Sequence, residues 1–368
     1  MFLSLRPSLS VSRLAVVRRA YSSPASKKQI NDGLVPLPHK EVIDMAFDLH
    51  LPERSVIGKL PYHSPEPIIF FHGLLGSKRN YKHDCKKLAT ALQTPVYTVD
   101  VRNHGSSEHA LPFNYGTLVN DLVHFIHQHK LGKVNIIGYS LGAKVGMLAC
   151  LKHPELFSAA CIIDNAPEPQ PHIKAFLSTL IKSCVKLLDQ GKVRVDDKLW
   201  RHKASESLKR YLPNAGVRNY VLNNIIHNPR VVEYRSPVIN YDDGLIHFKN
   251  PVRHMLDCGV KDVADWPTEE VKDKKFLGPV NFIRATKSAF INPDSLKAIN
   301  SFFPYNNIHE INATHFVLNE RPQEYLRAVI DFFKVTRYQL ENKRNKDSNN
   351  YIQTQNSISN SETMGQSL

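Results

Sequence analysis

Several features that define other protein classes are scarce or missing in this chain of 368 residues. No uninterrupted apolar run approaches 18 residues, so a membrane-spanning helix is not indicated. No internal repeat is evident. The five cysteines are odd in number and form no CxxC pair. Because they lie mostly inside apolar segments, we interpret them as buried free thiols of a reducing compartment rather than as a disulfide framework.

Acidic residues are fewer than basic ones, which gives a formal net charge of +14. Residues 1–31 contain six basic residues and no acid, so about +8 remains for the rest of the chain. The remaining Lys and Arg are scattered, without a basic stripe interleaved with aromatic residues, so nucleic acid is not an expected partner. A basic protein can still favour acidic small molecules.

The first 26 residues have the composition of a mitochondrial presequence. They contain four Arg, seven Ser and no acid, with Leu and Val spaced to form one apolar helical face. The sequence RRAYSS resembles a matrix-protease cleavage site and predicts a mature chain that begins near Tyr21–Ser23. We therefore expect residues 1–26 to be a cleaved presequence and the protein to be mitochondrial. A disordered basic tail of a cytosolic protein is the alternative.

After this segment, short β-rich runs alternate with helical patterns. Dense apolar runs that end in turn residues are typical of parallel strands covered on both faces. The expected strands cover residues 41–51, 67–73, 95–101, 133–138, 158–166, 278–285 and 306–313. Helical patterns separate most of these strands, so the sequence predicts an α/β fold with a mostly parallel sheet flanked by helices.

The alternation of strands and helices defines a core of residues 35–166 and 276–340. The interval 167–275 breaks this rhythm and is helical and rich in lysine. Ligands bind at the carboxyl ends of the strands in an open sheet, so an insertion on that side is expected to form a helical cap or lid. Residues 341–368 are polar and nearly free of apolar side chains, and are predicted to be a disordered tail.

The pentapeptide GYSLG, residues 138–142, follows a predicted strand and opens a predicted helix. This is the context of a G-x-S-x-G nucleophile elbow, in which a strained turn projects the serine hydroxyl outward. Side chains two positions before and after the serine would collide in such a turn, which explains Gly138 and Gly142. We therefore predict that Ser140 is a nucleophile and not an inert turn serine.

A serine nucleophile needs a base, and His315 is the best placed of the 18 histidines. It follows the last predicted strand, where a loop points back across the strand ends toward Ser140. Three other histidines, His124, His127 and His129, share one predicted helix, but no carboxylate or cysteine completes a ligand set there. No metal is therefore expected.

The acid that orients this histidine is less obvious. In many proteins of this architecture it follows the seventh strand, where the chain has Ser288 and the nearest carboxylate is Asp294. Asp294 better suits a helix N-terminus. Asp164, in CIIDNAP, lies at the end of the preceding core strand. We favour Asp164 and keep Asp294 as the alternative, since both preserve the order serine, acid, histidine. A purely structural Asp164 with some other acid is the third possibility.

The turn FHGLLGS after the strand at 67–73 predicts one half of an oxyanion site. The amide of Leu74 can face the pocket there and, together with the amide of Leu141, would bind a developing oxyanion. His72 is expected to shape this loop. Asp100, in the loop DVRNHGSS, precedes the nucleophile and is expected to brace its own loop.

Five segments together resemble the α/β-hydrolase superfamily over most of residues 35–335. They are FFHGLLGS, VDVRNHGSS, GYSLGAK, IIDNAP and THFVLNERPQEY. Within it they resemble the mitochondrial branch of human abhydrolase-11-type proteins and yeast ethanol acetyltransferases, and GYSLGAK followed by IIDNAP is most similar to the yeast family. The resemblance implies the α/β-hydrolase fold, with the cap between strands 6 and 7 of that fold. It places the nucleophile, acid and base on Ser140, Asp164 and His315.

The resemblance also implies an activity, since members of this family transfer acetyl from acetyl-CoA to ethanol and can hydrolyse esters and thioesters. The expected function is an alcohol O-acetyltransferase that forms ethyl acetate through a serine acetyl-enzyme. Acetyl-CoA is then a substrate, no cofactor is expected, and the partners are small molecules: acetyl-CoA, ethanol and short esters. Two alternatives stay open, namely a mitochondrial serine esterase or thioesterase without significant transfer to alcohols, and a non-catalytic scaffold of the same fold.

Overall fold

The computed structural model describes residues 36–52, 66–226, 236, 239–241, 243–258 and 260–342. All of them belong to one compact unit. The predicted presequence, residues 1–26, lies outside the described residues, as does most of the predicted tail. Residues 341 and 342, the first two of the predicted tail, belong to the last helix. Among the described residues, no helix is both long and apolar enough to cross a membrane.

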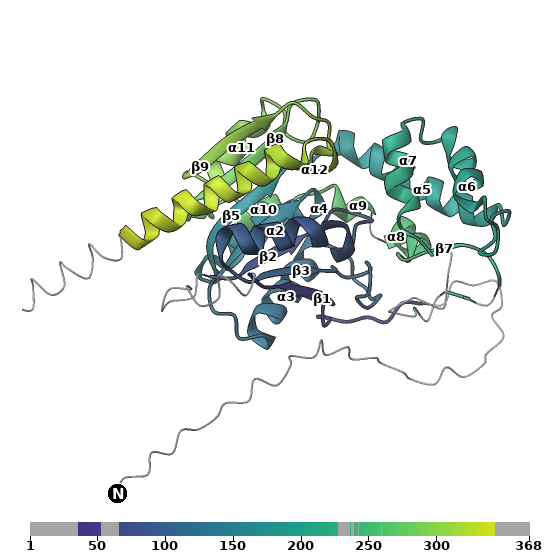
Figure 1. The fold of residues 1–368 in the computed structure, drawn as a ribbon, viewed down its shortest axis with the longest axis horizontal. Helices are drawn as coiled ribbons and strands as arrows, with labels where there is room; N and C mark the ends of the chain where they lie inside the picture. Colours follow the sequence, from purple (N-terminus) through teal and green to yellow (C-terminus); the bar gives the residue numbers. More distant parts are fainter. Residues whose placement is uncertain are drawn as a thin grey trace, which may run out of the picture. The chain divides into compact units, whose positions relative to one another are not determined.

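A seven-stranded sheet forms the centre of this unit (Figure 1). Its strands are β1 (Phe47–His50), β2 (Ile68–Phe71), β3 (Val96–Val99), β4 (Val134–Tyr139), β5 (Phe157–Ile163), β8 (Val280–Ala285) and β9 (Asn306–Ile311). Their order in space is β1-β3-β2-β4-β5-β8-β9. Only β1 pairs with its neighbour in antiparallel orientation, and the other pairs of this sheet are parallel. The predicted mostly parallel sheet is confirmed.

The first strand is shorter than predicted. The sequence pattern suggests a strand over 41–51, whereas only the residues of β1 pair with β3. Before β1, side chains bind the backbone amides: Ile43 donates to Asp121 Oδ1 at 2.8 Å, and Ala46 donates to Ser107 Oγ at 2.8 Å. Amides engaged by side chains do not join a ladder, so the chain stays irregular here although Ile43 is buried.

Two layers of helices cover the sheet. Helices α3 (Tyr115–Gln128), α4 (Leu141–Lys152) and α11 (Ser295–Phe302) lie on one face, and α2 (Lys82–Leu92) and the helix at 322–342 lie on the other. Successive residues of β2 alternate between the layers: Ile69 and Phe71 pack in the first, Ile68 and Phe70 in the second. Since neighbouring side chains on a strand point to opposite faces, burial of both faces requires the continuous apolar runs seen in the sequence.

The insertion between β5 and β8, called the cap below, is mainly helical. It contains α5 (Pro171–Asp189), α6 (Trp200–Lys209), α7 (Ala215–Leu222), α8 (Val252–Cys258), α9 (Val260–Val263), α10 (Thr268–Val271) and a ribbon of β6 (Ile225–Ile226) and β7 (His247–Phe248). Figure 1 draws α5, α6 and α7 as one group of neighbouring helices. In the numbering of the α/β-hydrolase fold, β5 and β8 are strands 6 and 7, although they are the fifth and sixth strands of this sheet along the chain.

Buried polar side chains tie the cap to the core. The ammonium of Lys144, on α4, donates to the carbonyls of Glu168 at 2.9 Å and Asp265 at 3.1 Å, so it joins both ends of the cap to one helix. The hydroxyl of Tyr115, on α3, donates to the Val263 carbonyl at 2.6 Å. The cap is thus attached through individual hydrogen bonds as well as through apolar packing.

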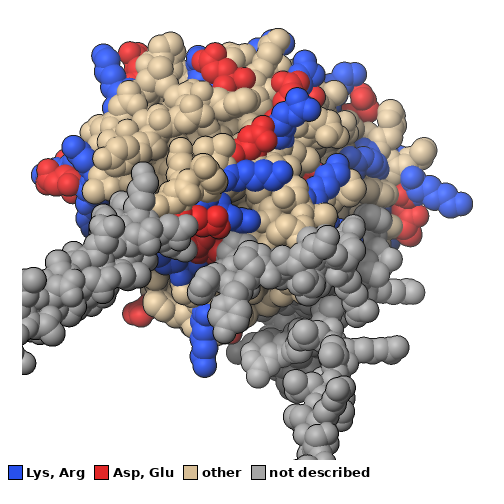
Figure 2. All heavy atoms as spheres, turned by 60° about the vertical axis from the view of Figure 1, so that its left-hand side comes forward, with Lys and Arg blue, Asp and Glu red and all other residues tan. Residues whose placement is uncertain are grey.

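The surface carries charges of both signs. On the face drawn in Figure 2, Lys and Arg lie interspersed with Asp and Glu. Pairs such as Lys152–Glu270, with 2.8 Å between Nζ and Oε2, are exposed and contribute at most about 1 kcal/mol each. The mixture on this face corresponds to the scattered charges of the sequence.

Candidate active site

The turn between β4 and α4 places Ser140 at the carboxyl edge of the sheet. Ser140 has φ 55° and ψ −112°, a strained backbone conformation for a residue with a side chain. A β-carbon on Gly138 would lie 2.3 Å from the Gly142 carbonyl oxygen, and one on Gly142 would lie 2.6 Å from Cβ of Phe71. Both distances are below van der Waals contact, so only glycine fits on either side of the serine.

Three side chains from separate loops form one hydrogen-bonded chain. His315 Nε2 lies 2.9 Å from Ser140 Oγ, and His315 Nδ1 lies 2.7 Å from Asp164 Oδ2. Because an ionised carboxylate only accepts, Nδ1 carries the ring proton and Nε2 is left to accept the serine proton. The structure therefore brings together the three residues that the sequence suggested, in the geometry of a nucleophile, its base and an orienting acid.

The carboxylate beside His315 belongs to Asp164 and not to Asp294. Asp164 is fully buried at the end of β5, and its second oxygen accepts from the Ala285 amide at 3.1 Å. Asp294 is exposed, lies immediately before α11, and its amide donates to the side chain of Asn292 at 2.8 Å. Its position is that of a helix-start residue, as its sequence context suggested.

Aromatic side chains hold the base. The ring of Phe290 stacks on His315 with 3.7 Å between centroids and 9° between planes. Tyr139, beside the nucleophile, stacks on the same imidazole at 5.2 Å, and its hydroxyl donates to the His315 carbonyl at 2.7 Å. Sequence reasoning missed both residues. The position of Tyr139 inside the elbow motif was a usable signal, whereas nothing in the loop around Phe290 marks it.

The loop after β2 passes directly beside the serine, since a β-carbon on Gly73 would lie 3.1 Å from Cβ of Ser140. Within the part of the chain that the structure describes, the amides of Leu74 and Leu141 donate to no protein acceptor. Both are therefore available to a ligand, as two oxyanion donors must be.

Both ring nitrogens of His72 are hydrogen-bonded to backbone atoms. Its Nδ1 donates to the Gly73 carbonyl at 2.8 Å, and its Nε2 accepts from the Val101 amide at 3.2 Å. Burial lowers the pKa of His72, which keeps the ring neutral, as these two bonds require. These contacts suit the expected role in shaping the loop.

Asp100 lies between two loops at the rim of the site. Its Oδ1 accepts from the Lys78 amide at 2.6 Å and its Oδ2 accepts from the Ser106 amide at 2.8 Å. A β-carbon on Gly105, whose φ is 55°, would lie 2.2 Å from Cγ of Asp100. The carboxylate thus ties the loop after β3 to the short 3-10 helix η1 (Lys78–Tyr81), which agrees with the expected bracing role.

The helix that carries the upstream histidines holds no assembled ligand set. His124 Nε2 lies 3.0 Å from Asp44 Oδ1 at the surface. Across the described residues, no group of three or more His, Cys, Asp or Glu side chains is arranged to hold a metal ion.

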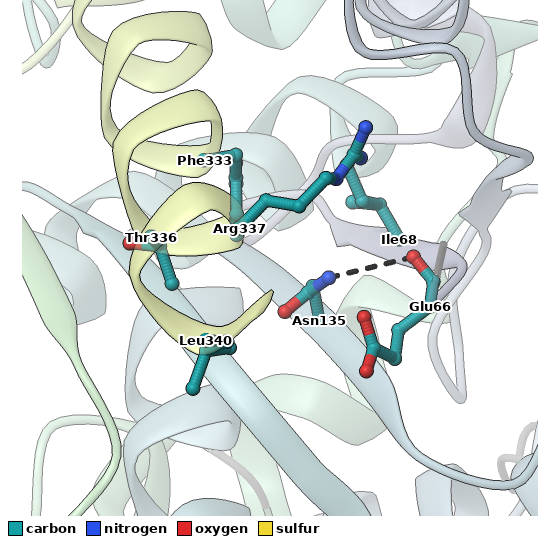
Figure 3. A pocket seen from close by; sticks show the side chains of 7 residues that line it. All are labelled: Glu66, Ile68, Asn135, Phe333, Thr336, Arg337 and Leu340. Atoms are coloured by element: carbon teal, nitrogen blue, oxygen red, sulfur yellow. Dashed lines mark hydrogen bonds between the residues drawn. The ribbon is translucent and has the colours of Figure 1, made fainter. Parts of the chain in front are cut away.

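A separate pocket lies at the opposite edge of the sheet (Figure 3). Its lining consists of Glu66, Ile68, Asn135, Phe333, Thr336, Arg337 and Leu340. Ile68 and Asn135 lie at the amino ends of β2 and β4, whereas Ser140 follows the carboxyl end of β4. Asn135 donates to the Glu66 carbonyl at 3.4 Å, so part of the lining is bound within the protein. This pocket is not part of the site around the serine.

Comparison with known proteins agrees with the fold. A family model described as alpha/beta hydrolase fold matches residues 66–190. Among solved structures, a marine microorganism esterase is similar in fold, with a TM-score of 0.63 and 24% identity over 79% of this chain and 99% of the esterase. This likeness concerns the fold alone.

Two curated relatives are much more similar in sequence. The chain is 99% identical over 368 residues to "Ethanol acetyltransferase 1" of Kluyveromyces lactis, with 100% of both chains covered. It is 76% identical over 336 residues to "Ethanol acetyltransferase 1" of Kluyveromyces marxianus, with 91% of this chain and 93% of the relative covered. The resemblance found in the sequence is confirmed: the chain belongs to the ethanol acetyltransferase family of the α/β-hydrolase superfamily.

Proposed function

We propose that this protein is an alcohol O-acetyltransferase that makes ethyl acetate from acetyl-CoA and ethanol through an acetyl-enzyme on Ser140. The observation that carries the proposal is the chain from Asp164 through His315 to the serine hydroxyl, with 2.9 Å between His315 Nε2 and Ser140 Oγ. The substrates are suggested by the names of the two Kluyveromyces relatives.

In the first half-reaction, His315 Nε2 takes the proton of Ser140 as Oγ attacks the thioester carbonyl. The negative charge that develops on the carbonyl oxygen is bound by the amides of Leu74 and Leu141. The intermediate collapses with cleavage of the carbon–sulfur bond. The departing sulfur takes the proton from His315, so coenzyme A leaves as a thiol and the acetyl group stays on the serine.

In the second half-reaction, ethanol occupies the place of coenzyme A. His315 Nε2 removes the proton of the alcohol, whose oxygen attacks the acetyl-enzyme through the same oxyanion geometry. Collapse returns the proton to Ser140 and releases ethyl acetate. Water can take the place of ethanol in this step and gives acetate, which accounts for esterase and thioesterase side activities.

Competition with water limits the yield of ester. A pocket gains only about 1–3 kcal/mol for each additional methylene that it binds, and water is far more concentrated than ethanol. We therefore expect part of the acetyl-enzyme to hydrolyse, in a proportion set by the cap above the site. Ester formation with no measurable acetate would contradict this account of selectivity.

The decisive test is a product assay. Purified protein is incubated with acetyl-CoA and ethanol, and ethyl acetate and acetate are measured together. We expect both products, and we expect Ser140→Ala to lower both rates by roughly five to six orders of magnitude. Acetate without ester would favour the esterase or thioesterase alternative. Neither product, together with no labelling of Ser140 by an organophosphonate, would favour the scaffold.

We also propose that the enzyme acts in mitochondria after cleavage of a presequence within residues 1–26. The support is compositional: four arginines, serine enrichment and no acid in a segment with one apolar helical face. Residues 1–26 fused to a fluorescent protein should direct it to mitochondria, and replacement of Arg6, Arg13, Arg18 and Arg19 by Asp should abolish import. A cytosolic signal from the unmodified fusion would contradict this part of the proposal.

A further inference from the structure

A tyrosine of the cap reaches the two loops on either side of the nucleophile. Tyr220, on α7, donates its hydroxyl hydrogen to the Leu74 carbonyl at 2.6 Å. Its ring lies 5.6 Å from the ring of Phe316, the residue after His315. Burial raises the pKa of Tyr220, so the phenol stays protonated and remains a donor. One cap side chain thus contacts the oxyanion loop and the base loop together.

The peptide group that carries the Leu74 amide is held on its carbonyl side by the core. This carbonyl belongs to Gly73 and accepts from His72 Nδ1 and from the Gly76 amide, both at 2.8 Å. In a trans peptide the N–H points away from the C=O. The hydrogen bonds to the Gly73 oxygen therefore constrain the direction of the Leu74 amide from one side, and the Leu74 carbonyl constrains it from the other.

The next peptide group is held from two sides. Its carbonyl, that of Leu74, accepts from Tyr220 in the cap, and its amide, that of Leu75, donates to His104 Nε2 in the core at 3.0 Å. His104 Nδ1 donates to the Arg102 carbonyl at 2.8 Å, so Nδ1 carries the proton of the neutral ring. Nε2 is then unprotonated and can accept from the Leu75 amide.

The loop needs such anchors because its backbone is strained. Leu75 has φ 58°, in the left-handed region, which costs a residue with a β-carbon about 1–2 kcal/mol. Strained backbone persists only where its surroundings determine it from several sides. The anchors described above come from the core except for the hydroxyl of Tyr220, which comes from the cap.

We propose that Tyr220 is a positioning residue that holds the oxyanion loop in its productive geometry, so that the cap controls the reaction rate through this hydrogen bond. The inference rests on the proposed function, since it requires the Leu74 amide to bind the oxyanion. Donors that are preorganised toward developing charge lose much of their effect when they become misaligned. Loss of the Tyr220 hydroxyl leaves the Leu74 carbonyl without its donor and lets this segment rotate.

The proposal makes a specific kinetic statement. An oxyanion develops in both half-reactions, so a misaligned Leu74 amide slows acetyl-enzyme formation and breakdown alike. The hydroxyl of Tyr220 does not choose between ethanol and water, so the ratio of ethyl acetate to acetate stays constant. The effect falls on kcat, while KM changes little, because the amide is needed in the transition state more than in the ground state.

The matched pair of variants is Tyr220→Phe and Tyr115→Phe. Each removes one hydroxyl that donates to a backbone carbonyl at 2.6 Å across the boundary between core and cap, and each keeps the aromatic ring. Tyr115 binds Val263, away from the oxyanion loop. General weakening of the cap attachment should therefore appear in both variants, and loss of oxyanion positioning only in Tyr220→Phe.

The assay is hydrolysis of p-nitrophenyl acetate, with ethyl acetate formation and thermal midpoints measured on the same preparations. We expect Tyr220→Phe to lower kcat about tenfold with KM within about twofold. Tyr115→Phe should keep both kcat and KM within about twofold of the wild-type values. Its thermal midpoint should fall by about as much as that of Tyr220→Phe, since each variant loses one hydrogen bond.

Equal kcat in the two variants, or a loss confined to KM, would overturn the inference. Hydrolysis of p-nitrophenyl acetate reports the acetyl-enzyme whether or not an alcohol accepts the group. Absence of ethyl acetate with normal hydrolysis would therefore refute the transferase function and leave the role of Tyr220 to be decided by the hydrolysis data. A wild-type protein that hydrolyses nothing would overturn both.

Discussion

The edge of the sheet around Ser140 and the boundary between core and cap are held by different kinds of contact. Around the serine, backbone packs on backbone: the hypothetical β-carbons of Gly138 and Gly142 meet heavy atoms at 2.3 and 2.6 Å. At the boundary, individual polar side chains such as Lys144 and Tyr220 reach individual carbonyls. The first arrangement leaves no room for an added atom, whereas the second includes, beside apolar packing, single hydrogen bonds that can be removed one at a time.

This difference sets the size of the effects that substitutions should have. A steric overlap with backbone cannot be relieved without moving the strand or helix that carries it, and overpacking costs about 1–3 kcal/mol or more. A lost hydrogen bond costs about 1 kcal/mol, with more where a buried partner is left unsatisfied. Substitutions at the edge of the sheet around Ser140 should therefore abolish activity or folding. Substitutions at the boundary between core and cap should change activity or stability by smaller amounts.

After that of Ser140→Ala, the largest expected effect is on activity, from Asp164→Asn. The new side-chain oxygen can still accept from the Ala285 amide, but its NH2 group would face His315 Nδ1 and force the other ring tautomer. Nε2 would then carry a proton and could not accept one from Ser140, which lowers kcat by about 10⁴-fold. Ethyl acetate formation by the purified variant measures this loss.

The control for that experiment is Asp294→Asn, which changes an exposed carboxylate before α11. We expect its kcat to stay close to the wild-type value. Near-wild-type activity of Asp164→Asn would show that another group orients His315, and the edge of the sheet around Ser140 would then tolerate loss of this carboxylate.

The second effect is on stability, from Gly142→Ala. Its new methyl group would lie 2.6 Å from both Cβ and the carbonyl oxygen of Phe71, so β2 or α4 has to move. We expect the free energy of unfolding to fall by about 3 kcal/mol or more in urea denaturation.

Gly146→Ala is the matched control on the same helix. There the nearest heavy atom is the terminal Cδ1 of Ile136, at 3.3 Å, which can give way. Alanine also has a helix propensity about 1 kcal/mol better than glycine, so this variant should be within about 1 kcal/mol of the wild type. Equal losses in the two variants would mean that the elbow is not specially crowded.

The serine edge was largely predictable from sequence, because its determinants are local. A dense apolar run, two glycines and a serine in five residues define Ser140, and the short segment CIIDNAP offers Asp164. The sequence favoured Asp164 over Asp294, and the contact between His315 Nδ1 and Asp164 Oδ2, at 2.7 Å, agrees with that choice. The first strand was predicted too long, because an alternation of apolar residues does not show that the amides of Ile43 and Ala46 donate to side chains instead of to a neighbouring strand.

The boundary was not predictable in the same way, for a physical reason. The acceptors at the boundary are backbone carbonyls, which carry no signature in the sequence. Lys144 belongs to the motif GYSLGAK, but no sequence pattern indicates that it donates to the carbonyls of Glu168 and Asp265. Tyr220 lies in a stretch with helical pattern alone, far along the chain from the Leu74 that it binds.

The smallest expected effect concerns the pH dependence of stability and belongs to Lys144. Burial lowers the pKa of Lys144 to about 7, against the opposing influence of Asp265 and Glu168. In the unfolded chain the pKa of lysine is about 10.4. Above pH 7 the unfolded chain therefore holds a proton that the folded protein releases, so stability rises with pH. The increase is at most about 1.4 kcal/mol per pH unit.

Urea unfolding of the wild type and of Lys144→Met isolates this contribution. Between about pH 7 and about pH 8.5 the free energy of unfolding should rise more steeply in the wild type than in the variant, because the unfolded cysteine thiols ionise alike in both. Lys152→Met is the control, since Lys152 lies on the same helix and pairs with Glu270 of the cap at the surface. It should keep the wild-type slope. Identical slopes in all three proteins would mean that the Lys144 ammonium is as well solvated in the folded protein as outside it, and the boundary would then contain no strongly desolvated charge.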